Sequence, residues 1–149
     1  MELKTQRLKI IPCTNELLST IRPEEYDIHP HIDKYVEELN KDSTLLGWGV
    51  WLVLSKEDNR IIGDIGFKGK PTLDQTVEIG YGILPSAQNK GYATEAVREI
   101  IKWAFSFDTV NMVVAECLID NLPSIKVLEK LEMKRVGTED KMLKWQLKK

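Results

Sequence analysis

The sequence has little cysteine and no long apolar run, and both absences narrow the class of protein. Cys13 and Cys117 are its two cysteines, and they show no metal-ligand spacing. Because disulfides are rare inside cells, we expect two reduced thiols. No segment approaches the ~20 apolar residues of a transmembrane helix, and the N-terminus lacks the apolar core of a signal peptide. The sequence therefore predicts a cytoplasmic protein with no bound metal and no membrane association.

An excess of charge of one sign is also absent. The 21 Lys and Arg residues and 23 Asp and Glu residues give a formal net charge of −2. Proteins that bind nucleic acid usually carry a basic excess, so we expect no nucleic-acid partner. The 149 residues contain no repeat, low-complexity segment or linker, and this length suits one domain. We expect a single domain over residues 1–149, as a monomer or a homodimer.

Hydrophobic periodicity and turn residues predict an α/β chain. We expect strands near 8–10, ended by Pro12, and at 48–54, 61–67, 76–84, 112–119, 133–136 and 142–147. We expect helices near 15–21, 31–40, 91–107 and 121–131. The helix at 91–107 has the strongest pattern, because its apolar residues form one continuous stripe at helical spacing.

The strand at 76–84 carries two glycines next to an acidic residue. Period-2 alternation places Glu78, Gly80 and Gly82 on one face of this strand. Glycines in a strand often mark a bulge or the close approach of a ligand, and Glu78 would then border a face free of side chains. A glycine-packed strand with a solvent-facing glutamate explains the pattern equally well.

Two strand-to-helix junctions could bind a ligand. The first runs through a polar loop to Gly91, where free N–H groups at the start of the long helix favour a phosphorylated ligand. The second is Asn121-x-x-Ser124. Asn121 is a good N-cap with Ser124 in the first turn, and the ends of strands are also where α/β proteins bind ligands.

The order strand, Gln88-x-x-Gly91-x-Ala93, helix, strand, Asn121-x-x-Ser124, helix resembles the GNAT superfamily of acetyl-CoA-dependent N-acetyltransferases. The opening Leu3-x-Thr5-x-Arg7-Leu8 is most similar to the ribosomal-protein N-terminal (Rim-type) branch. The resemblance implies a mixed, mostly antiparallel central sheet in one domain. That sheet is splayed between its fourth and fifth strands and flanked by about four helices.

The resemblance also implies a binding site for acetyl-CoA as cosubstrate, with no metal. Its diphosphate would be held by the backbone N–H groups of Gln88, Asn89, Lys90, Gly91, Tyr92, Ala93 and Thr94. The pantetheine would pair with the backbone of Ile83 and Leu84 and contact Asn121. Ser124 would lie near the thioester sulfur as the acid, and Glu78 would be the base. Glu116 on the next predicted strand is the alternative base, but an outward-facing strand charge explains this residue too, and water alone is a third choice.

The sequence departs from the family pattern at three positions. Leu128 stands where many members have a tyrosine general acid, so Ser124 becomes the stronger candidate for that acid. Asn89 and Glu132 each replace a glycine that is common in the family.

The resemblance implies acetyl transfer to a primary amine of a small molecule or a protein N-terminus. An α-amine with a pKa of ~7.8 costs about 1.1 kcal/mol to deprotonate at neutral pH, against about 4.6 kcal/mol for a lysine amine, so a weak base favours an α-amine. A non-catalytic acyl-CoA sensor of the same fold is the alternative. A nucleotide-binding protein is disfavoured, because the chain has no Gly-x-x-x-x-Gly-Lys-Ser/Thr loop.

Overall fold

The computed structural model describes residues 1–149 and contains one eight-stranded sheet. The strands are β1 (Leu3–Lys4), β2 (Leu8–Pro12), β3 (Val50–Ser55), β4 (Ile61–Phe67), β5 (Thr76–Ile83), β6 (Met112–Leu118), β7 (Lys134–Glu139) and β8 (Met142–Lys148). Their order across the sheet is β1-β2-β3-β4-β5-β6-β8-β7. Every neighbouring pair is antiparallel except β5 and β6, which are parallel.

Four α-helices connect and cover these strands: α1 (Asn15–Ser19), α2 (Pro30–Lys41), α3 (Tyr92–Phe105) and α4 (Leu122–Lys130). The apolar stripe predicted for α3 is its buried face, with Ala96, Val97 and Ile100 fully shielded from solvent. The Thr14 hydroxyl caps α1 by accepting from the Leu17 N–H, and Pro30 occupies the first turn of α2, where its missing N–H costs little.

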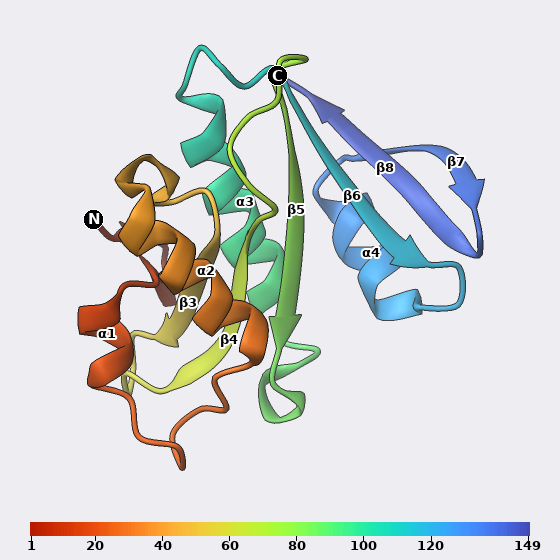
Figure 1. Cartoon of the computed structure of the whole chain (residues 1–149). Helices are drawn as coiled ribbons and strands as arrows, with labels where there is room; N and C mark the ends of the chain where they lie inside the picture. The colour runs from red at the N-terminus through yellow and green to blue at the C-terminus, as the bar shows by residue number, and fades with distance from the viewer.

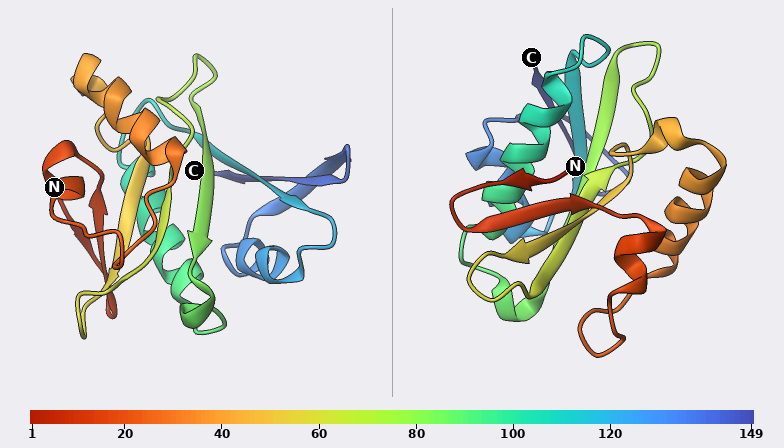
Figure 2. Two further views of the ribbon diagram at one scale, coloured as in Figure 1. Left: turned by 60° about the horizontal axis from the view of Figure 1, so that its bottom comes forward. Right: turned by 90° about the vertical axis from the view of Figure 1, so that its left-hand side faces the viewer.

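The helices lie on both faces of the sheet (Figures 1 and 2). The larger core packs α3 and α4 against one face, and it includes Trp51, Ile65, Val97 and Leu128. A smaller cluster packs α2 against the other face through Ile32, Val36 and Leu52. Because α2 covers β3 and β4, β5 stands at the border of this second layer (Figure 1).

The parallel strands β5 and β6 pair only at their start. The register joins Thr76 to Met112, Val77 to Val113 and Glu78 to Val114, and no pairing follows. Beyond this point the two strands diverge, as Figure 1 shows. The sheet is therefore split into a β1–β5 half and a β6–β8 half, which confirms the predicted splay.

The structure adjusts some sequence predictions. Pairing of β5 with β4 is regular through Ile83, so the glycines of β5 mark no bulge; the register shifts instead at Val53/Leu54 and at Arg135/Gly137. The short strand β1 was not predicted, and α1 ends at Ser19 rather than at 21. None of the helices is long and apolar enough to cross a membrane.

Candidate active site

The splay leaves backbone groups of β5 without a partner strand. Lys68 donates its N–H to the carbonyl of Glu78, and Leu84 donates to the carbonyl of Ile62, so the even-numbered residues of this strand bond toward β4. The N–H and carbonyl groups of the odd-numbered residues point the other way, toward the gap between β5 and β6. The carbonyl of Ile83 accepts from the Gln88 side chain at 2.9 Å. Because the pairing with β6 ends at Glu78, Tyr81 and Ile83 have no partner strand on this side, whereas Leu84 uses both of its backbone groups within the protein.

The loop after β5 presents consecutive N–H groups without a hydrogen-bond partner in the protein. They belong to residues 89–94, and the first helical bond of α3 is donated by Glu95 to the carbonyl of Gly91. Gly91 has φ of +81° and Asn89 has φ of +63°. Asparagine is among the few residues that tolerate this left-handed conformation, which explains how Asn89 replaces the expected glycine. Free N–H groups arranged in this way can accept an anion.

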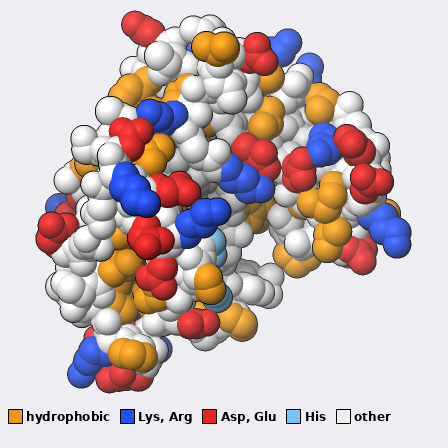
Figure 3. Space-filling view, in the orientation of Figure 1, with side chains coloured by type: hydrophobic (Ala, Val, Ile, Leu, Met, Phe, Trp, Pro, Cys, Tyr) orange, Lys and Arg blue, Asp and Glu red, His pale blue; other side chains and the backbone are white.

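A cleft of about 510 Å³ lies between this loop and α4. Figure 3 shows the surface hollowed between the two halves of the molecule. The predicted site residues that line the cleft are Ile83, Gln88, Asn89, Gly91, Tyr92, Ala93, Thr94, Asn121 and Ser124. Leu84, Lys90 and Glu78 are not among the lining residues.

Tyr81 and Ser124 meet at the wall of the cleft, and sequence reasoning missed this tyrosine. The two hydroxyl oxygens are 2.6 Å apart, and the Tyr81 hydroxyl also lies 3.4 Å from the carbonyl of Ser124. Burial raises the pKa of the Tyr81 phenol, and the hydrogen bond with Ser124 lowers it by less. The phenol is therefore protonated at neutral pH and can donate to the serine.

Asn121 caps α4, as the sequence predicts. Its side-chain oxygen accepts the N–H of Ser124 at 3.2 Å. This bond fixes the amide so that its NH₂ group remains available at the cleft wall. The capping and ligand-binding interpretations of Asn121 are thus compatible.

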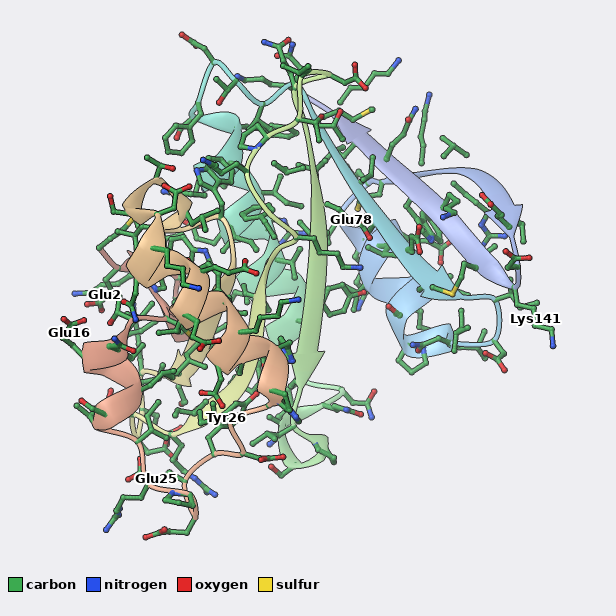
Figure 4. The ribbon with its side chains drawn as sticks, in the orientation of Figure 1. Glu2, Glu16, Glu25, Tyr26, Glu78 and Lys141 are labelled. Atoms are coloured by element: carbon green, nitrogen blue, oxygen red, sulfur yellow. The ribbon has the colours of Figure 1, made fainter.

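Glu78 lies on β5 where the pairing with β6 ends (Figure 4). Side-chain alternation along the strand places it on the opposite face from Tyr81. Its carboxylate forms an ion pair with Lys68 at 2.8 Å. A Cβ at Gly82 would touch nothing within 4 Å, so this face of the strand is open. The alternative base, Glu116 on β6, is hydrogen-bonded to Lys144; this bond lowers the pKa of Glu116, and the nearby Lys68 lowers it further.

Comparison with known proteins identifies the family. The model of the acetyltransferase (GNAT) domain matches residues 13–134. The chain belongs to the GNAT family. An acetyltransferase of this family from Bacillus anthracis has a solved structure that is 25% identical, with a TM-score of 0.72, covering 99% of this chain and 98% of that one.

Two further proteins named as acetyltransferases are similar to this chain. The uncharacterized N-acetyltransferase YjdG of Bacillus subtilis (strain 168) is 38% identical over 105 residues, which are 70% of this chain and 62% of that protein. The structure of RimL, a ribosomal L7/L12 alpha-N-protein acetyltransferase in complex with coenzyme A, has a TM-score of 0.80 at 13% identity and covers 99% of this chain and 98% of that one. The chain spans between about half and just under two thirds of the length of the first curated relatives it matches.

The GNAT tyrosine position is occupied differently here. Leu128, which stands there, is fully buried in the main core, one helical turn after Ser124. The hydroxyl that meets Ser124 comes instead from Tyr81 on β5. No group of His, Cys, Asp or Glu side chains is arranged to hold a metal ion.

Proposed function

We propose that this chain is an acetyl-CoA-dependent N-acetyltransferase that acetylates a primary amine by direct attack. One observation carries the proposal. The six free N–H groups of residues 89–94 stand at one end of a cleft whose wall also carries the paired hydroxyls of Tyr81 and Ser124. This arrangement suits a long ligand with a phosphate group at one end and a reacting thioester at the other.

In the proposed complex, the diphosphate of acetyl-CoA binds the N–H groups of the loop and the N-terminus of α3. The pantetheine lies in the splay and pairs with Tyr81 and Ile83, whose backbone groups face it. Asn121 contacts the pantetheine through its free NH₂ group. The geometry supports Ile83 better than Leu84, because both backbone groups of Leu84 are already bonded.

In the proposed reaction, the neutral amine attacks the thioester carbonyl, a C–N bond forms and the C–S bond breaks. The leaving sulfur takes its proton from the hydroxyl of Ser124, Tyr81 passes its own proton to the serine oxygen, and the phenol then regains a proton from solvent. The proton lost by the amine passes to Glu78 through water. Glu78 is on the open face of β5, so the acceptor approaches from the side opposite Tyr81.

The acceptor is proposed to be an α-amine, either of a protein N-terminus or of a small molecule. The proposed base is a carboxylate, and any carboxylate is a weak base toward an amine. A weak base is sufficient for an amine with a pKa of ~7.8 and insufficient for a lysine amine of ~10.4.

Thermal unfolding with acetyl-CoA, CoA or ATP in separate samples tests the proposal. A ligand at ~100 times its Kd stabilises the native state by about 2.7 kcal/mol, which raises Tm by roughly 5–10 °C for a chain of this size. A rise with both CoA species but not with ATP supports the proposal. No rise with either CoA species at millimolar concentration contradicts it.

A second assay separates a transferase from a sensor. Release of free CoA thiol is followed with a panel of peptide N-termini, amino acids, polyamines and lysine side-chain amines. Turnover with α-amines above the acceptor-free hydrolysis rate is the expected result. Binding of acetyl-CoA without turnover on any acceptor would favour the acyl-CoA sensor.

A further inference from the structure

The turn between β1 and β2 is fastened to the first turn of α3. The Thr5 hydroxyl donates to the Glu95 carboxylate at 2.5 Å, and the backbone N–H of Arg7 donates to it at 3.0 Å. The Nε of Arg7 forms an ion pair with the other carboxylate oxygen at 2.7 Å. Glu95 therefore accepts three bonds from a segment about 90 residues earlier in the chain.

Arg7 also contacts the anion-binding loop directly. Its guanidinium donates to the carbonyl of Lys90 at 2.9 Å and lies over the Tyr92 ring, 4.4 Å from the centroid. A Cβ added at Gly91 would meet the guanidinium at 3.4 Å. Arg7 does not line the cleft, whereas Gly91 and Tyr92 do, so the guanidinium holds the loop from behind.

This contact determines where one N–H group points. In a planar trans peptide the carbonyl and the N–H point in opposite directions. Because the carbonyl of Lys90 points to Arg7, the N–H of Gly91 in the same peptide points away from Arg7. The bond thus orients an N–H that the loop presents to an anion.

The ion pair with Arg7 also balances the negative charge of Glu95. Glu95 lies in the first turn of α3, next to the loop, and a free carboxylate there would repel a bound diphosphate. Burial raises the pKa of Glu95, but the bonds from Thr5 and Arg7 outweigh burial and hold this pKa below its ordinary value. The carboxylate is therefore ionised at neutral pH, and Arg7 is the cation that neutralises it.

We propose that Arg7 is a positioning residue for the diphosphate of CoA. It orients the Lys90–Gly91 peptide and neutralises Glu95, so that the loop after β5 can accept an anion. This inference rests on the proposed function, because it takes CoA as the ligand. It gives the opening Leu3-x-Thr5-x-Arg7-Leu8 segment a role in a site that lies far away in the sequence.

The test is calorimetric titration of CoA into the full chain and its variants. Arg7→Gln is expected to weaken CoA binding about 10-fold, as an unneutralised charge at a helix N-terminus would. Arg7→Lys keeps the charge beside Glu95 without the fork of donors, and we expect an intermediate Kd. Arg60→Gln removes the same charge from the exposed β3–β4 turn and should leave the Kd unchanged.

Two further measurements separate positioning from a general loss of structure. S-acetylpantetheine lacks the diphosphate, so its Kd should be the same in the wild type and in Arg7→Gln. The double variant Arg7→Gln/Glu95→Gln removes the uncompensated carboxylate and should bind CoA more tightly than Arg7→Gln alone. Once an acceptor amine has been identified, we expect Arg7→Gln to raise the KM for acetyl-CoA and to leave kcat unchanged.

The inference is overturned if Arg7→Gln binds CoA as tightly as the wild type, or if it weakens CoA and S-acetylpantetheine equally. If Arg7→Gln does not fold, Arg7→Lys replaces it. The inference then requires that Arg7→Lys raises the Kd for CoA more than the Kd for S-acetylpantetheine, relative to the wild type. In each of these cases the wild type still binds CoA and the proposed function stands. A wild type that binds no CoA would overturn the proposed function and this inference together.

Discussion

The hydroxyls of Tyr81 and Ser124 lie 2.6 Å apart at the wall of the cleft, although 43 residues separate them in the chain. Tyr81 comes from β5, one edge of the splay, and Ser124 from the first turn of α4, on the other side of it. The contact therefore bridges the two halves of the sheet. A proton donor for a leaving thiolate can be assembled here without the tyrosine that many GNAT members carry on the following helix.

Ser124→Ala is expected to lower kcat about 100-fold, which is typical of the loss of a general acid, and to leave the Kd for CoA unchanged. Tyr81→Phe should reduce kcat less, because it keeps the ring and the serine. If the hydroxyls act as one unit, the double variant will be no slower than Ser124→Ala. Single-turnover release of CoA thiol measures all three rates. Full turnover in Ser124→Ala would remove the serine from the mechanism.

Glu78→Gln is expected to lower kcat/KM, because an amide cannot accept the proton of the amine. The decline in rate at acidic pH is expected in both proteins, because the acceptor amine itself becomes protonated. Glu116→Gln is the matched variant on the neighbouring strand. The Glu116 carboxylate is bound to Lys144, which lowers its pKa and weakens it as a base, so this variant should keep the wild-type kcat/KM. Wild-type kcat/KM in Glu78→Gln would show that another group, or water, takes the proton.

The stability of the protein should depend on the ionisation of Glu95. Its pKa is lower in the folded state than the ordinary value of 4.5, so the carboxylate stabilises the fold above that pH and this contribution is lost as the pH falls through the folded-state pKa. Urea unfolding of the wild type and Glu95→Gln at several pH values measures it. We expect the wild type to be more stable at pH 7 and the difference to shrink below pH 4.5. A difference that does not change with pH would exclude this ionisation effect.

The sequence predicts well what depends on local pattern. Residue spacing alone predicts the apolar face of α3, the N-cap Asn121 of α4 and the inward-facing residues of β5. Alternation places Tyr81 on the inward face of β5, but nothing in the sequence names its partner on α4. Arg7 and Glu95 are 88 residues apart, and their contact depends on how the β1–β2 turn packs against α3. Such long-range pairs are fixed by tertiary packing and have no local signal.

The end of α4 carries a residue in an unfavourable conformation. Glu132 has φ of +64° and follows the C-cap, where Met133 donates to the carbonyl of Leu128 and Glu132 donates to that of Glu129. This is a Schellman motif, which favours glycine. Glu132→Gly should stabilise the fold by up to about 1 kcal/mol, because the strain removed exceeds the entropy cost of glycine. Urea unfolding measures the difference, and a destabilised Glu132→Gly would mean that the glutamate makes compensating contacts.

A substitution at Gly82 should change the activity of the protein without changing its stability. A Cβ there would touch nothing within 4 Å, yet Gly82 lines the cleft. Gly82→Val should therefore fold with unchanged Tm and lose acetyl transfer, because the added side chain occupies the space of the ligand. Gly137→Val is the matched control, since Gly137 is an exposed strand glycine of β7 with equally open space and lies outside the cleft. We expect the control to keep both Tm and activity. Wild-type activity in Gly82→Val would show that neither the pantetheine nor the acceptor passes over this face of β5.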